Sequence, residues 1–192
     1  MGINSQPKIE KLKILVLGIG NVMFSDEGIG VHITKMIEKN YTFYSKKHTI
    51  DFVDGGTLAN ILIPTIVEYD NVLIIDCIDA DDGKIGDVYF FDYNDMPKMI
   101  NWSGSAHEVE MLQTLQMMEI LGDRPETKIL GVVPKRIEPL SFDLSEEIQK
   151  AVPLMEKTII NHLKQFEFEI KKIANYSVQD IADQFKKEQY DN

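Results

Sequence analysis

The chain has 192 residues, of which 44% are hydrophobic and 27% charged, as in most soluble globular proteins. Lysine and arginine number 20 against 31 aspartates and glutamates, so the formal net charge is -11, which disfavours binding to nucleic acid or anionic membranes. The single cysteine, Cys77, excludes an internal disulfide framework and a thiolate zinc cage. The start Met1–Lys13 is polar and no apolar run reaches the length of a membrane span, so we expect a cytoplasmic protein without membrane insertion.

The first third of the chain alternates between strand and helix patterns. Lys11–Gly18 is a continuous apolar run, typical of a strand buried on both faces. Apolar residues at helical spacing predict a helix over 26–41, which starts between Asp26 and Gly28. Thr49–Asp54 predicts a second strand. Leu58–Tyr69 predicts a short helix that begins or kinks at its internal proline.

The alternation continues along the rest of the chain. Asn71–Cys77 predicts a third buried strand, and the short link to Asp87–Tyr93 favours an antiparallel, hairpin-like fourth strand. Ser105–Gly122 predicts a helix that opens with a capping box and ends at glycine. Thr127–Val133 predicts the last strand, and a long helix follows from near Ser145 to about Phe168.

This order of elements predicts an α/β fold. Alternating strands and helices indicate a three-layer sandwich, in which helices cover both faces of a mostly parallel, twisted sheet. No repeat or linker divides the chain, so we expect residues 1–168 to form a single domain. The charged C-terminal extension, 169–192, is expected to be either a further helix or a frayed tail.

Polar residues follow the predicted strands. Because ligands of open parallel sheets bind at the carboxyl ends of the strands, these residues are expected to meet at one rim. They are Asn21, Asp26, Glu27, Asp54, Gly55, Gly56, Thr57, Asp76 and Asp79, together with His107 from the helix after the fourth strand.

The glycine turn after the first strand allows two interpretations. Gly18 and Gly20 resemble the start of a dinucleotide-binding fingerprint, but Met23 stands where its third glycine is needed. The lysine motif of phosphate-binding loops is also absent from the sequence. A tight strand-to-helix turn is therefore favoured, with nucleotide binding as the alternative.

Three rim residues form a candidate metal site. Glu27, Asp76 and His107 offer the oxygen and nitrogen ligands that Zn²⁺ and Ni²⁺ accept, and a helix N-terminus favours the neutral imidazole of His107. Structural alternatives stay open, since Glu27 suits the first turn of a helix and Asp76 the end of a strand.

The remaining reactive side chains suggest no other chemistry. No Ser-His-Asp or Cys-His arrangement is evident, and Cys77 lacks an electropositive neighbour in the sequence, so an inert thiol is expected. His32, His48 and His162 lie on polar or helical stretches and are given no role.

Five sequence blocks together resemble the hydrogenase maturation protease family, the endopeptidases that process the large subunit of NiFe hydrogenases. The resemblance extends from Leu12 to Phe166, and the blocks occur in the order of the family. They are GIGNVMFSDEGIGV (Gly18–Val31), DGGT (Asp54–Thr57), IIDCIDA (Ile74–Ala80), SAHEVE (Ser105–Glu110) and GVVPKRIEPL (Gly131–Leu140).

The resemblance implies roles for several of these residues. Glu27, Asp76 and His107 match the metal ligands of the family, and the DGGT loop matches its segment for substrate recognition and cleavage. Asp54 is a candidate general base, and activation of the water by the metal is the alternative. The family commonly has proline before the histidine, where this sequence has Ala106, a departure that affects loop stiffness rather than ligand identity.

The implied function is removal of the C-terminal extension from a NiFe hydrogenase large-subunit precursor after nickel insertion. Nickel is then shared with the bound precursor and serves as the recognition signal, while the isolated protein can bind other divalent metals. The alternative is a non-enzymatic, nickel-binding maturation chaperone that uses the same three ligands.

Overall fold

The computed structural model describes residues 11–57, 59–96, 100–101 and 106–190, with the side chains of 59, 101, 106–109 and 190 left out. Five strands form the main sheet and four short ones form two small pairs. They are β1 (Lys13–Ile19), β2 (Tyr41–Tyr44), β3 (Thr49–Gly56), β4 (Asn71–Cys77), β5 (Asp79–Ala80), β6 (Val88–Asp92), β7 (Ile100–Asn101), β8 (Glu126–Val132) and β9 (Glu169–Lys172).

The strand order of the main sheet is β3-β1-β4-β8-β6. All neighbours are parallel except β6, which is antiparallel to β8. The predicted α/β class is therefore confirmed. Antiparallel pairing of the fourth predicted strand is also confirmed, but the hairpin with β4 is wrong, because β8 inserts between β4 and β6.

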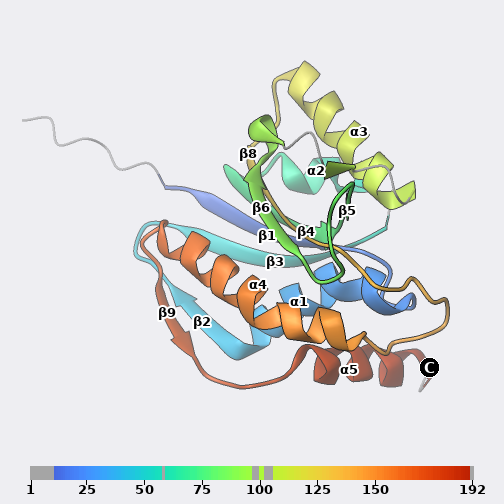
Figure 1. The fold of residues 1–192 in the computed structure, drawn as a ribbon. Coiled ribbons are helices and arrows are strands. Elements are labelled where there is room, and N and C mark those ends of the chain that lie inside the picture. The colour runs from blue at the N-terminus through green and yellow to red at the C-terminus, as the bar shows by residue number, and fades with distance from the viewer. Residues whose placement is uncertain (1–10, 58, 97–99, 102–105, 191–192) are drawn as a thin grey trace, which may run out of the picture.

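Helices cover both faces of the sheet, as the sequence predicts (Figure 1). The α-helices are α1 (Ile29–Asn40), α2 (Ile63–Ile66), α3 (Ala106–Leu121), α4 (Glu146–Lys164) and α5 (Val178–Tyr190). Short 3-10 helices are η1 (Ser25–Gly28), η2 (Ala59–Leu62) and η3 (Tyr93–Asp95). α1, α4 and α5 pack on one face and α2 and α3 on the other, and each face has its own hydrophobic cluster.

Burial follows the position of each strand in the sheet. β1 and β4 lie in the centre, and nearly every side chain of both strands is buried, which explains their continuous apolar sequences. β3 ends the sheet, and its side chains are mostly exposed or half-buried. The central strands therefore supply the rigid frame from which the loops at the carboxyl edge project.

The structure departs from the predicted elements mainly in short segments. The predicted helix over 26–41 ends one residue earlier, and Tyr41–Tyr44 forms a strand that pairs antiparallel with β9. Of the two alternatives for the C-terminal extension, a further helix is confirmed, because α5 follows β9. The hydrophobic cluster under α1 includes Ile181 of α5. The predicted helix over 58–69 is reduced to η2 and α2, with the proline in the first turn of α2. The predicted cap, Ser105, lies outside the described residues.

Candidate functional site

The candidate site lies at the carboxyl edge of the sheet, where the chain changes direction. From β1 the chain passes through α1 to β3 on one side, and it then returns to β4 on the other side of β1. Such a reversal leaves an opening outside the ends of two adjacent strands. The η1 helix, which contains Glu27, follows β1 at this point, and Asp76 lies near the end of β4.

Helix α1 packs unusually close to the ends of these strands. A Cβ atom on Gly30 would lie 2.2 Å from the carbonyl oxygens of both Ile19 and Ile75, and one on Gly18 would lie 2.3 Å from the carbonyl oxygen of Gly30. Glycine is therefore required by backbone approach at both positions. This packing supports the interpretation of the glycine turn as a strand-to-helix connection.

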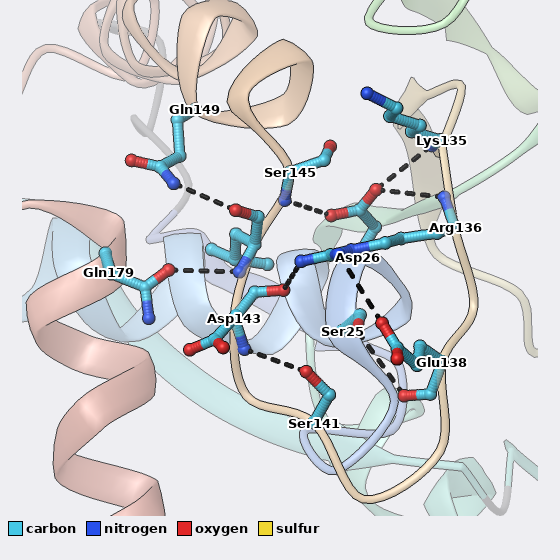
Figure 2. Close-up of polar contacts among 11 residues, drawn as sticks. Ser25, Asp26, Lys135, Arg136, Glu138, Ser141, Asp143, Ser145, Gln149 and Gln179 are labelled. Atoms are coloured by element: carbon cyan, nitrogen blue, oxygen red, sulfur yellow. Dashed lines mark hydrogen bonds and ion pairs between the residues drawn. The ribbon is translucent and has the colours of Figure 1, made fainter.

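The adjacent acidic residues of η1 have different environments. Asp26 is fully buried, and its carboxylate accepts hydrogen bonds from the backbone amides of Lys135 (3.0 Å), Arg136 (3.2 Å) and Ser145 (2.7 Å) (Figure 2). Both oxygens are thus occupied by the loop between β8 and α4. Asp26 is therefore a structural anchor, which the sequence analysis did not recognise.

A hydrogen bond links the segments that carry Glu27 and Asp76. The thiol of Cys77 donates a hydrogen bond to the carbonyl oxygen of Asp26 at 3.1 Å, so the residue before Glu27 contacts the residue after Asp76. Glu27 is 7% exposed and Asp76 is 3% exposed. Two acidic residues with little solvent access therefore lie on linked segments of the carboxyl edge, where buried charges require compensating partners.

The alternation of side chains along β4 directs Asp76 toward the α3 face. Ile74 belongs to the cluster under α3, whereas Cys77 belongs to the cluster on the opposite face. The backbone of Asn101 pairs with Asp79 just beyond β4, which keeps the segment before α3 at the same edge. His107 is the second residue of α3, but its side chain lies outside the described part of the structure. Its role as a ligand therefore stays a prediction.

No three His, Cys, Asp or Glu side chains among the described residues form a metal-binding group. That search covers Glu27 and Asp76 without the side chain of His107. The proposed three-ligand site is consequently argued from backbone placement and from the chemistry of the donors.

The DGGT loop closes the end of β3 beside the glycine turn. The Asp54 carboxylate accepts a hydrogen bond from the amide of Gly56 at 2.8 Å, and Gly56 has a φ of 56°, which favours glycine. The amide of Gly20 donates to the carbonyl oxygen of Gly56 at 3.0 Å. A shallow pocket of about 190 Å³ lies here, lined by Gly20, Asn21, Val22, Asp54, Gly56 and Thr57.

Three rim candidates remain, Asn21, Asp79 and Gly55. The side-chain oxygen of Asn21 accepts a hydrogen bond from the amide of Met23 at 3.0 Å, which stabilises the turn after β1. Asp79 is exposed in β5. Gly55 is buried near the end of β3.

The three histidines without a predicted role, His32, His48 and His162, are buried. His32 is fully buried in α1 against the ring of Phe185, and burial lowers its pKa to about 4. Burial, followed by the charge of Lys128, likewise lowers the pKa of His162 to about 4. His48 accepts a hydrogen bond from the amide of Leu12. All three therefore belong to the packing of the domain.

The described part of the chain contains no helix with the length and apolarity needed to cross a bilayer.

The family model described as hydrogenase maturation protease matches residues 31–162. Protein HydD of Wolinella succinogenes is 50% identical over 153 residues, which cover 79% of this chain and 96% of that protein. The hydrogenase 2 maturation protease of Escherichia coli is 28% identical over 129 residues, which cover 67% and 77% of the two chains.

Solved structures of hydrogenase maturation proteases have the same fold as this chain. The hydrogenase maturating endopeptidase HybD from E. coli superposes with a TM-score of 0.73 at 24% identity, over 84% of this chain and 98% of that one. The NiFe hydrogenase maturation protease HybD from Thermococcus kodakarensis gives a TM-score of 0.57 at 26% identity, over 77% and 99%. The chain belongs to the hydrogenase maturation protease family and is an endopeptidase of that family.

Proposed function

We propose that this endopeptidase removes the C-terminal extension of a NiFe hydrogenase large-subunit precursor after nickel insertion, in the cytoplasm. Nickel in this scheme belongs to the substrate, because it is already bound in the precursor. The observation that carries the proposal is the placement of two buried acidic residues on the carboxyl edge of the sheet, where the DGGT loop also lies: Glu27 in η1 after β1, and Asp76 near the end of β4.

The donor chemistry suits a borderline divalent ion. Glu27 and Asp76 offer carboxylate oxygens and His107 an imidazole nitrogen, a mixed set that Ni²⁺ and Zn²⁺ accept. Three ligands leave coordination positions for groups of the precursor. We therefore expect the isolated protein to bind nickel or another divalent metal only moderately, and the loaded precursor to bind far better.

The DGGT loop is suited to act on the peptide bond itself. The Asp54 side chain is exposed at the rim of the shallow pocket, and one of its oxygens is held by the amide of Gly56. A carboxylate oriented in this way can take a proton from an attacking water. We assign Asp54 as the candidate general base, and Gly55, Gly56 and Thr57 as the segment that contacts the substrate backbone.

Mass spectrometry of the precursor tests this function. Incubation of nickel-loaded precursor with the unmodified protein should shorten the large subunit at its C-terminus, whereas nickel-free precursor should stay intact. Glu27→Gln, Asp76→Asn and His107→Ala should each abolish the cleavage while melting remains cooperative. Nickel binding that depends on His107, without a change in precursor mass, would instead indicate a maturation chaperone.

Calorimetry tests the ligand assignment separately from the cleavage. Titration of the isolated protein with Ni²⁺ should give a site that is lost or weakened at least tenfold in His107→Ala. Undiminished binding by that variant would overturn the ligand set. Asp79→Asn is a matched control, since Asp79 is exposed just beyond β4 and outside the set.

A further inference from the structure

Strand β3 presents an unpaired edge immediately before the DGGT loop. β1 is its neighbour in the described part of the sheet, and β3 has no other. The amide of Thr49 donates to the carbonyl oxygen of Leu12, so alternate residues starting at Thr49 face β1. The amides and carbonyls of Ile50, Phe52 and Asp54 therefore face away from the sheet, and no described residue hydrogen-bonds to them.

A groove of about 290 Å³ accompanies this edge on the face that carries α1 and α5. Phe52 of β3 and Phe185 of α5 supply the aromatic part of its lining, whereas Val31 and Ile181 are almost fully buried. The rest of the lining is mostly polar and charged, from Thr34, Lys35, Glu38, Lys39, Gln184 and Glu188. Asp54 lines one end of the groove and also lines the shallow pocket at the DGGT loop. The groove and the candidate cleavage site are therefore continuous at Asp54.

An extended peptide fits both features together. A strand added to a sheet edge gains hydrogen bonds to the exposed amides and carbonyls, and its side chains alternate between the two faces. Along β3, every second side chain of such a peptide would enter the groove between α1 and α5. The edge supplies backbone recognition, and the groove offers alternate side chains both the aromatic rings of Phe52 and Phe185 and the charged groups beside them.

We propose that the C-terminal extension of the precursor binds as an added strand, antiparallel to β3, with alternate side chains in this groove. The proposal deepens, and rests on, the cleavage function proposed above. The direction follows from the position of the cut. If the scissile bond lies at Asp54, the extension must run from the carboxyl end of β3 toward Thr49, which is antiparallel.

A proline scan along the extension of the full precursor tests the added strand without altering this protein. Proline removes one amide hydrogen, and pairing with β3 uses the amides of alternate residues only. The KM for cleavage should rise about fivefold or more at every second position and change little at the positions between them. A KM without this two-residue period would overturn the proposal.

Matched variants of this protein identify the edge. Phe52→Pro removes an outward amide of β3 together with a side chain of the groove, so Phe52→Ala is the control for the side chain alone. Phe90→Pro removes an outward amide of β6, the opposite edge strand, where the register with β8 also turns residue 90 outward. Phe52→Pro should raise KM about fivefold, and Phe90→Pro should leave it unchanged. Equal KM values in the two folded variants would exclude β3 as the docking edge.

The two proposals fail in different ways. If the unmodified protein cleaves no nickel-loaded precursor, the proposed function is wrong. If it cleaves the precursor but the scan shows no period, the function stands and the added strand is wrong. If Phe52→Pro does not melt cooperatively, the precursor scan alone decides, since it uses the unmodified protein.

Discussion

The carboxylate of Asp26 accepts a hydrogen bond from the amide of Ser145, 119 residues later in the chain, at 2.7 Å (Figure 2). Ser145 is also the N-cap of α4, because its hydroxyl accepts a hydrogen bond from the amide of Ile148. One carboxylate thus joins the glycine-turn block of the sequence to the loop that begins with GVVPKRIEPL and to the start of α4. The two adjacent acidic residues therefore differ in role. Asp26 anchors the loop between β8 and α4, and Glu27 is the candidate ligand at the site.

Replacement of Asp26 should destabilise the fold. Asp26→Asn places an amide group among backbone N–H donors and removes a buried charge that those donors compensate, so we expect a loss of about 3 kcal/mol or more in the free energy of unfolding. Urea denaturation measures this change. Asp143→Asn is the control, since Asp143 is exposed in the same loop and should change stability by less than about 0.5 kcal/mol. Equal free energies of unfolding for Asp26→Asn and Asp143→Asn would contradict the anchoring role of Asp26.

Enlargement of Gly30 should separate α1 from the ends of β1 and β4. Gly30→Ala forces a methyl group against the carbonyl oxygens of Ile19 and Ile75, and we expect a cost on the order of 3 kcal/mol together with loss of cleavage. Gly122→Ala is the comparison, because Gly122 has a φ of 79° but open space around it, so only about 1 kcal/mol of backbone strain is expected. Denaturation curves in which Gly122→Ala costs more would refute the steric argument.

Stability should fall as the pH is lowered from about 6.5 to about 4. In this window the unfolded chain protonates His32 and His162, whereas the folded protein keeps both neutral, so the unfolded state binds more protons. Each histidine should remove on the order of 3 kcal/mol by the lower end of the window. His32→Phe should flatten this dependence, as measured by the free energy of unfolding at pH 7.5 and pH 5. An unchanged slope would show that His32 is not responsible.

Asp54→Asn should distinguish the structural role of Asp54 in the turn from its role as a general base. Asparagine keeps an oxygen for the amide of Gly56 but loses the basic carboxylate, so the cleavage rate should fall about 100-fold or more with little change in melting temperature. Asp51→Asn is the control in the same strand, where asparagine can still accept the hydrogen bond from Tyr69. A normal rate with Asp54→Asn would place the general base elsewhere.

The central strands could be predicted because their sequences reflect their surroundings directly. β1 and β4 are buried on both faces, and Lys11–Gly18 and Asn71–Cys77 are correspondingly apolar without interruption. The start of the last long helix near Ser145 could also be predicted from the local sequence. Predictions of short elements were wrong where the element depends on a partner far away in the sequence. Tyr41–Tyr44 continues an apolar pattern, and only its pairing with Glu169–Lys172 makes it a strand.

The candidate site likewise combines features that the local sequence predicts with contacts that it does not. Glu27, Asp76 and the DGGT loop follow β1, β4 and β3, and strand order alone is enough to place these segments at the carboxyl edge. Strand order does not separate Asp26 from the other rim residues. The bonds of Asp26 go to main-chain amides more than 100 positions away, and amides leave no signature in the side-chain sequence.

The buried thiol of Cys77 can report on the contact between η1 and the end of β4. Its hydrogen bond to the carbonyl oxygen of Asp26 keeps the one cysteine of the chain 2% exposed. Alkylation by a thiol reagent therefore requires the contact between η1 and the end of β4 to open. The labelling rate of the unmodified protein thus measures how often the two carboxylate-bearing segments separate, and docking of the precursor should slow that rate.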